Sequence, residues 1–264
     1  IDASASALNI SASMAFQGFV SDIEIIDIAA ARADAYTRAE ATATGIDGGD
    51  GDDQIFSSGD ITVDATSETL SVTAAIAIQK SVKEAVNLEG TMADVSATAT
   101  AAAVGINGGK GQDTITSTGT TTVTAESRNA GVGLSAAITC EAEKGLVANA
   151  AVAKADTTAT ASAVGISGGE GEDTIFNSGA VDVTADAGAL SAEVGLTLQG
   201  SNTKVLSLQG ALATVTTTVE ATAEGLSGGV EDDVIINEGD LNVEADSLGI
   251  AAAIAANITP KKTK

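Results

Sequence analysis

The sequence predicts an all-β fold, a repetitive β-solenoid or β-roll-like array of about 4.4 sixty-residue repeats. Three observations predict it. Glycine, aspartate and isoleucine recur at a 60-residue spacing, apolar residues alternate with polar ones, and Ala, Val, Ile and Leu supply most of the 44% hydrophobic content. With four Phe, one Tyr and no Trp, the core must be built from small and β-branched side chains, which suits a thin interior.

The repeat keeps its length from the first unit to the last. The positions in step are Gly45, Gly105, Gly165 and Gly225, then Ile55, Ile115, Ile175 and Ile235, then Val63, Val123, Val183 and Val243. Stacked units need constant length, because an insertion in one would disrupt its contact with the next. The chain is therefore predicted to be one β array over residues 1-264. Its parts are a partial repeat 1-44, repeats near 45-104, 105-164 and 165-224, a partial repeat 225-259, and a basic tail 260-264.

Within a repeat, apolar residues alternate with period two, which predicts strands. The apolar residues are odd-numbered at Ile61 and Val63, even-numbered from Leu70 to Ile78, and odd-numbered again over 95-103. A slip of one residue moves side chains to the other face of a sheet, so each change of phase predicts a turn or a bulge. Turns are expected at 47-53, 58-59, 66-69 and 79-84. The alanine-rich stretch 96-104 is the one place where a helix competes with a strand.

Two architectures satisfy this pattern. In a solenoid, repeats coil and stack in parallel, either as one coil of 60 residues or as about three coils of 20. In the alternative, each repeat is a long antiparallel hairpin with its tips at the glycine-rich turn and at 79-84. The strict period and the small interior residues favour the solenoid.

Charge and composition exclude several classes of function. Thirty-six acidic and twelve basic residues give a formal charge of -24, which opposes binding to nucleic acid and favours cations. A single cysteine, Cys140, cannot form an intrachain disulfide, and the absence of histidine excludes a histidine base or ligand. No apolar run approaches the roughly 18 residues of a membrane-spanning helix, so membrane insertion is not expected. No nucleophile and base stand in a recognisable pattern, and we expect no enzyme activity.

Four glycine-rich acidic turns are the candidate binding sites: GIDGGDGDDQI, GINGGKGQDTI, GISGGEGEDTI and GLSGGVEDDVI. Calcium takes six to eight oxygens from carboxylates and carbonyls, and glycines let the chain turn its carbonyls inward. The alternative is a solvated turn whose charges oppose edge aggregation. The second turn is poorest in acids, with Lys110 beside Asp113, so its calcium affinity should be below that of the first. The candidate metal ligands are Asp47, Asp50, Asp52, Asp53, Asp113, Glu170, Glu172, Asp173, Glu231, Asp232 and Asp233.

These turns resemble the calcium-binding nonapeptide of repeats-in-toxin proteins, G-G-x-G-x-D-x-U-x, where U is a large apolar residue. Gly48, Gly49, Gly51, Asp53 and Ile55 fit it, the second and third turns fit at the corresponding positions, and the fourth has Glu231 in place of the third glycine. Members of that family carry the motif in tandem, whereas here it occurs once per 60 residues. A 60-residue coil would stack the motifs about 4.8 Å apart as an ion-sharing ladder, and 20-residue coils would isolate them.

The whole chain resembles the repetitive regions of large secreted bacterial surface proteins, including adhesins. That resemblance implies a structural extracellular module, a spacer, filament or matrix element, stiffened by calcium and located outside the cell or on its surface. Its expected partners are calcium ions and further copies of the repeat, with self-association into a fibre. The alternative is an adhesive module that binds carbohydrate or another surface through one face of the array. The scarcity of aromatic residues argues against carbohydrate.

Overall fold

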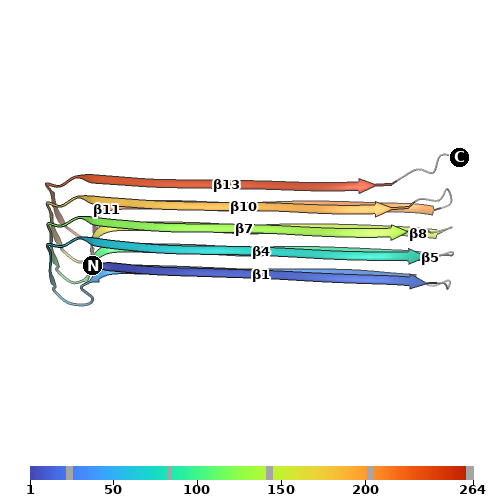
Figure 1. Ribbon diagram of the computed structural model, residues 1–264, viewed down its shortest axis with the longest axis horizontal. Coiled ribbons are helices and arrows are strands. Elements are labelled where there is room, and N and C mark those ends of the chain that lie inside the picture. The colour runs from blue at the N-terminus through green and yellow to red at the C-terminus, as the bar shows by residue number, and fades with distance from the viewer. Residues whose placement is uncertain (22–25, 82–84, 141–144, 201–204, 260–264) are drawn as a thin grey trace.

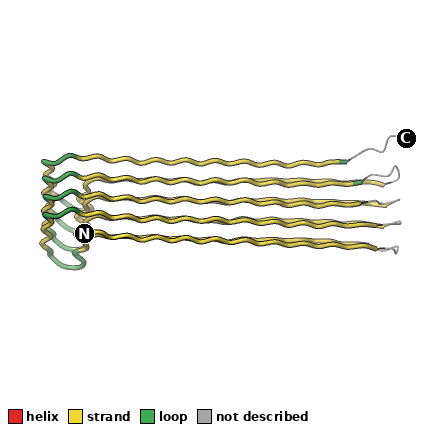
Figure 2. Tube along the Cα trace, in the orientation of Figure 1, coloured by secondary structure: helices red, strands yellow, loops and turns green. Residues whose placement is uncertain are grey.

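The protein is described here by a computed structural model that places residues 1–21, 26–81, 85–140, 145–200 and 205–259. Within these ranges every regular element is a β-strand (Figure 2). The predicted basic tail, 260-264, lies outside the described residues. The stretch 96-104, where a helix was the alternative, is part of a strand.

The strands form three parallel sheets, stacked coil upon coil (Figure 1). Sheet A contains long strands in the order β1 (Asp2–Ser21), β4 (Ile61–Ser81), β7 (Thr121–Cys140), β10 (Val181–Gln199) and β13 (Leu241–Ile258). Sheet B contains β11 (Val205–Val230), β8 (Gly145–Glu170), β5 (Ala85–Lys110) and β2 (Ile26–Asp47). The short sheet C contains β12 (Val234–Asn237), β9 (Thr174–Asn177), β6 (Thr114–Ser117) and β3 (Gln54–Ser57).

One coil is 60 residues long. Val63 pairs with Val123, and Val123 with Val183, and every described strand pair keeps the same 60-residue register. The two long strands of a coil, such as β4 and β5, belong to different sheets and face each other, so their hydrogen-bonded neighbours come from the coils before and after. The solenoid is thus confirmed. The hairpin alternative is wrong because the strands pair in parallel. The 20-residue coil is wrong because each residue pairs with the one 60 positions away in the adjacent repeat.

The core lies between sheets A and B and is richest near the glycine-rich turns. We call that end of each coil proximal and the opposite end distal. In the proximal half of the long strands, odd-numbered residues such as Val63, Val123 and Ala101 are buried. Nearer the turn, the even-numbered Ile106 is also buried, together with Ile115 of sheet C. Alternate side chains point to opposite faces of a strand, so the odd phase supplies the core along the long strands as far as residue 105, and the buried phase changes at Ile106.

The turn expected at 66-69 does not exist, because β4 runs unbroken through it. The buried phase stays odd: Ser71 and Thr73 point inward with 0% and 1% exposure, while Leu70 and Val72 point outward with 39% and 38%. Along this strand the apolar residues therefore move from the inner face to the outer face, while the backbone continues without a turn. The bends at 47-53 and 58-59 are confirmed. At 79-84, β4 ends at Ser81 and β5 begins at Ala85, and residues 82–84 lie outside the described ranges.

Candidate metal site at the glycine-rich turns

Each glycine-rich turn bends through backbone conformations that L side chains rarely adopt. The φ angles are +93° at Gly49 and +127° at Gly51, and the next turn repeats them with +109° at Gly109 and +126° at Gly111. A Cβ atom strains such a conformation, whereas glycine adopts it freely. The G-x-G spacing in the sequence is therefore a requirement of the turn itself, with or without a bound ion.

Stacking imposes a second requirement on the same glycines. A Cβ atom on Gly109 would lie 1.9 Å from the carbonyl oxygen of Gly49 in the preceding coil. The turns are that close because they bond to each other: Lys110 N donates to Gly49 O at 2.8 Å, and Gly51 N donates to Lys110 O at 2.7 Å. Successive motifs thus lie directly on one another, as the 60-residue coil requires.

The four aspartates of the motif form a continuous ladder along the stack. Asp53 N donates to Asp113 Oδ1 at 2.7 Å, Asp113 N to Asp173 Oδ1 at 2.8 Å, and Asp173 N to Asp233 Oδ1 at 2.9 Å. We call Asp53, Asp113, Asp173 and Asp233 the aspartate column. One oxygen of each carboxylate above Asp53 therefore satisfies a backbone amide that the turn would otherwise leave unpaired.

The second oxygen of these carboxylates is buried without a hydrogen-bond partner. This holds for Oδ2 of Asp53, Asp113 and Asp173, and the last two residues are each only 1% exposed. Burial raises the pKa of Asp173; the hydrogen bond from the Asp113 amide opposes this, and the charges of Asp113 and Asp233 add to it. A buried, unpartnered carboxylate oxygen is costly, so a proton or a cation at this position would be stabilising.

Carbonyl oxygens lie close to the free carboxylate oxygens. A Cβ atom on Gly168 would be 2.4 Å from both Asp173 Oδ2 and the carbonyl oxygen of Gly228 in the next coil. Both oxygens therefore lie against the same side of this glycine. Carboxylate and carbonyl oxygens are the donors that calcium takes, so the donor types fit the ion.

The remaining predicted ligands lie on the outer surface of the turns. Asp47, Asp50, Asp52, Glu170, Glu172, Glu231 and Asp232 are all exposed. Some of them bond to the next coil: Asp47 accepts from Asn107 Nδ2 at 3.1 Å, and Asp52 accepts from the amide of Gln112 at 3.0 Å. Among the described residues, no three acidic side chains are placed together as metal ligands. The structure thus aligns the aspartate column and leaves the outer acids separate from it.

The fourth turn departs from the first three in the way its sequence predicts. Glu231 replaces the third glycine and has φ +86°, the one positive φ at a non-glycine position among the described residues. The hydrogen bond from Gly171 N to Val230 O is 3.4 Å long, against 2.8 Å for the equivalent bond from Gly111 N to Glu170 O. A side chain at this position therefore coincides with a looser contact between the third and fourth turns.

Two buried carboxyls in the distal half were not predicted. Burial raises the pKa of Glu89 to about 7, although a hydrogen bond from Thr139 Oγ1 at 2.9 Å opposes the shift. Burial likewise raises the pKa of Glu193 to about 7, helped by the charge of Asp94, and neither oxygen of Glu193 has a hydrogen-bond partner. The sequence held one signal of their burial: both are odd-numbered, in the same phase as the buried Ile61 and Val63.

No protein-family model, curated protein or solved structure matches the chain. Over the part of the chain that the structure describes, there is no helix with the length and apolar character needed to cross a membrane.

Proposed function

We propose that the chain is a structural repeat module of a secreted or surface-exposed bacterial protein, acting as a spacer, filament or matrix element and stiffened by calcium at the aspartate column. Its role is mechanical, without enzyme activity. Calcium ions and further copies of the repeat are its partners.

The observation that carries the mechanical role is the unbroken 60-residue register. Each inner long strand bonds along its length to the strand one coil earlier and the strand one coil later, so each added repeat extends the array by one strand spacing, about 4.8 Å. Stability in such arrays is the sum of repeat and neighbour-interface contributions. Length and stiffness are thus set by the repeat count, as a spacer needs.

Support for calcium comes from the aspartate column. Its free Oδ2 atoms are buried beside glycine carbonyls, and stacking holds the carboxylates in line. A bound calcium ion would neutralise this run of like charge. Asp53, Asp113, Asp173 and Asp233 would hold it with glycine carbonyls, and water would fill the remaining positions of the six to eight that calcium takes.

Thermal melting with calcium, and then with a chelator, tests the proposal. Calcium should raise the Tm, because it binds the folded turns and not the unfolded chain. The double variant Asp113→Asn with Asp173→Asn should lose most of this response, since it removes the two central charges. It should still fold, because each Asn keeps an oxygen that can accept the neighbouring amide.

A matched control removes two charges from the outer surface instead. The variant Asp52→Asn with Glu172→Gln changes the net charge by the same amount and leaves the aspartate column intact. It should keep the calcium response. If calcium does not change the Tm of the unmodified chain, or if both double variants lose the response equally, the aspartate column is not the calcium site.

A further inference from the structure

The outer face of sheet A is entirely apolar over its distal half. We call the outward, even-numbered residues of 10–16, 70–78, 130–138, 190–198 and 250–258 the distal apolar face; all are Ala, Val, Ile, Leu, Met or Phe. Even on inner strands, which have neighbours on both sides, large side chains remain open to solvent: Leu70 is 39% exposed, Val132 40% and Leu190 45%. Contiguous apolar patches of this kind mark interaction surfaces.

On the inside, the same strands carry polar residues among alanine and glycine, and no large apolar side chain. Thr73, Thr139, Glu193 and Gln199 point inward and are at most 2% exposed. In the proximal half the order is the usual one, with Val and Ala inside and acidic or threonine residues outside. The distal strands thus turn their apolar side away from the interior of their own coil. Such a face is built to pack against something outside the coil.

The size of the face matches a protein interface. Five strands about 4.8 Å apart and nine residues of about 3.3 Å each give roughly 24 by 30 Å, or about 700 Å² per copy. Two such faces would bury about 1,400 Å², within the range of stable protein pairs. The outer face of sheet B carries a smaller apolar area, which on β8 runs from Leu146 to Val152 and on β2 is interrupted by Arg32. Four strands and seven residues give about 19 by 23 Å, so two such faces would bury about 900 Å², below the range of stable pairs.

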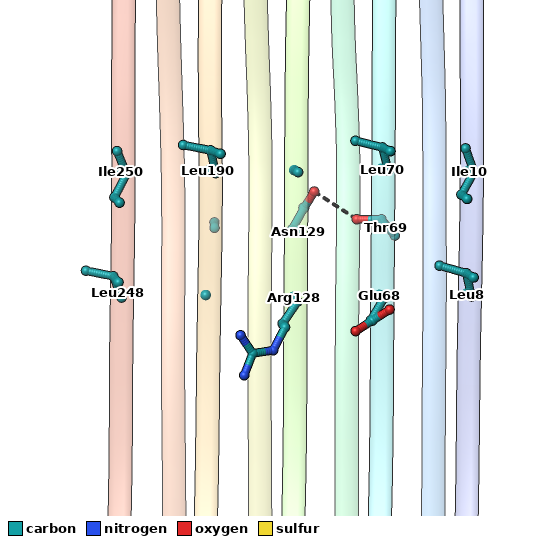
Figure 3. Close-up of a pocket in the computed structure, with 13 residues that line it drawn as sticks. Leu8, Ile10, Glu68, Thr69, Leu70, Arg128, Asn129, Leu190, Leu248 and Ile250 are labelled. Atoms are coloured by element: carbon teal, nitrogen blue, oxygen red, sulfur yellow. Dashed lines mark hydrogen bonds between the residues drawn. The ribbon is translucent and has the colours of Figure 1, made fainter.

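Shape and charge favour a second copy of the chain as the occupant. A recess of about 540 Å³ lies between the ridges of Leu70 and Leu190, because Ala130 occupies the strand between them and Gly188 precedes Leu190 on its own strand (Figure 3). Ridge and recess on one face suit an interface in which both partners use the same surface. Glu68 and Arg128 border the recess and form its polar rim.

Sheet geometry and net charge also favour a second copy of the chain as the occupant. All-parallel sheets occur almost only with both faces covered, and a second sheet packs at about 10 Å on a flat apolar one. A two-fold axis that lies in the interface and runs perpendicular to the strands would point the acidic proximal halves of the two copies in opposite directions. This matters for a chain of charge -24. The same charge disfavours an anionic lipid surface.

From these observations we infer that two copies of the chain associate through the distal apolar face, sheet A against sheet A, by a two-fold axis. The association does not use the glycine-rich turns. It should therefore be the same in calcium and in chelator, which separates it from the calcium proposal.

Sedimentation equilibrium from about 1 µM to about 1 mM protein, in calcium and in chelator, measures the association. The wild-type chain should be dimeric at the upper concentrations. Leu70→Glu with Leu190→Glu should raise the dimer Kd by at least about a hundredfold, because charges would be buried within the interface. The control Thr62→Glu with Thr184→Glu adds the same charge to the proximal outer face of the same strands and should leave the Kd within about threefold.

A cross-link gives a second measurement that does not depend on a destabilising variant. In a Cys140→Ser background, Val132→Cys places a thiol on the central strand of the face and should form a disulfide-linked dimer. Thr122→Cys, on the same strand in the proximal half, should not.

Several outcomes would overturn the inference. One is a wild-type chain that is monomeric throughout the concentration range. Another is equal weakening by the two glutamate pairs while circular dichroism shows both folded. A third is a monomer that floats with phosphatidylcholine vesicles unless Leu70 and Leu190 are replaced, which would identify a lipid surface as the occupant.

Discussion

Single glycine substitutions in the turns test why glycine is required there: for the turn conformation alone, or also for the close stacking of successive motifs. Gly49 and Gly109 are equivalent residues of successive coils, with φ +93° and +109°. A Cβ atom on Gly49 meets nothing within 4 Å, whereas one on Gly109 lies 1.9 Å from Gly49 O. The pair therefore separates the conformational cost of a side chain from its steric cost.

The two variants should lose different amounts of unfolding free energy, and the difference is large enough to measure by thermal melting. Gly49→Ala carries only the cost of an L residue at positive φ, about 1–2 kcal/mol. Gly109→Ala adds the loss of the bonds at 2.8 Å and 2.7 Å that hold the two turns together, each worth about 1 kcal/mol, and the strain of separating the coils. A total of about 3–5 kcal/mol follows. At roughly 2–4 °C per kcal/mol, the Tm should fall by about 5 °C for the first variant and about 10–15 °C for the second.

A third variant controls for position in the array, because Gly49 lies in an end coil where fraying could hide its effect. Gly229 is also in an end coil, yet a Cβ atom there would lie 1.9 Å from Gly169 O. Gly229→Ala should therefore behave like Gly109→Ala in circular dichroism melting. Equal losses for Gly49→Ala and Gly109→Ala would refute the stacking argument, as would a Gly229→Ala variant as mild as Gly49→Ala.

Three further expectations concern single residues. Glu231→Gly should raise the Tm, since it removes a side chain from φ +86° and allows the 3.4 Å bond to the preceding turn to shorten; an unchanged or lower Tm would contradict this. Because burial raises the pKa of Glu89 and Glu193 to about 7, each contributes stability, about 1–2 kcal/mol once solvent screening is allowed for, that is present below about pH 4.5 and lost as the pH rises through about 7. Urea unfolding at about pH 4.5 and about pH 8.5 measures this loss, and Glu193→Gln should reduce it; an unchanged difference in that variant would assign it to other groups. In chelator at neutral pH, Asp173→Asn should unfold at higher urea than the unmodified chain, since the raised pKa marks the ionised carboxylate as costly in the fold, and lower stability would contradict this cost.

The repeat register and the turn glycines could be predicted from the sequence, because both are backbone requirements that restrict which residues and which repeat lengths can occur. A glycine at positive φ has few substitutes, and a coil that pairs in register tolerates no insertion. Coil length could not be decided in the same way. Residues 60 apart correspond in a single coil, in three short coils and in a hairpin, and the choice depends on which strands share a sheet.

The inverted distal half could not be read from hydrophobicity, because a period of two says that two faces differ and not which of them is inside. Taking Leu70 and Val72 as core residues forced a turn at 66-69 that the backbone does not make. The correct signal was the continuity of the odd phase from Val63 through Ser71. Polar residues in that phase mark the interior, and the apolar residues of the even phase mark an outer surface.

In the aspartate column, stacking brings carboxylates of like charge close together, which is electrostatically unfavourable. Stacking aligns equivalent residues of successive coils, and at some positions the chain sets opposite charges side by side: Lys110 lies between Asp50 and Glu170, and Lys154 pairs with Asp94. The aspartate column keeps four acids in line. Neighbouring ionised carboxylates about 4.8 Å apart repel by on the order of 3 kcal/mol at an effective dielectric constant near 20. Three such contacts rival the whole stability of a typical domain, even if exposure of the end members halves the sum. Burial raises the pKa of Asp173, and the charges of Asp113 and Asp233 add to the shift, so a proton and a divalent cation are alternative ways to relieve the cost of charge at its Oδ2 atom.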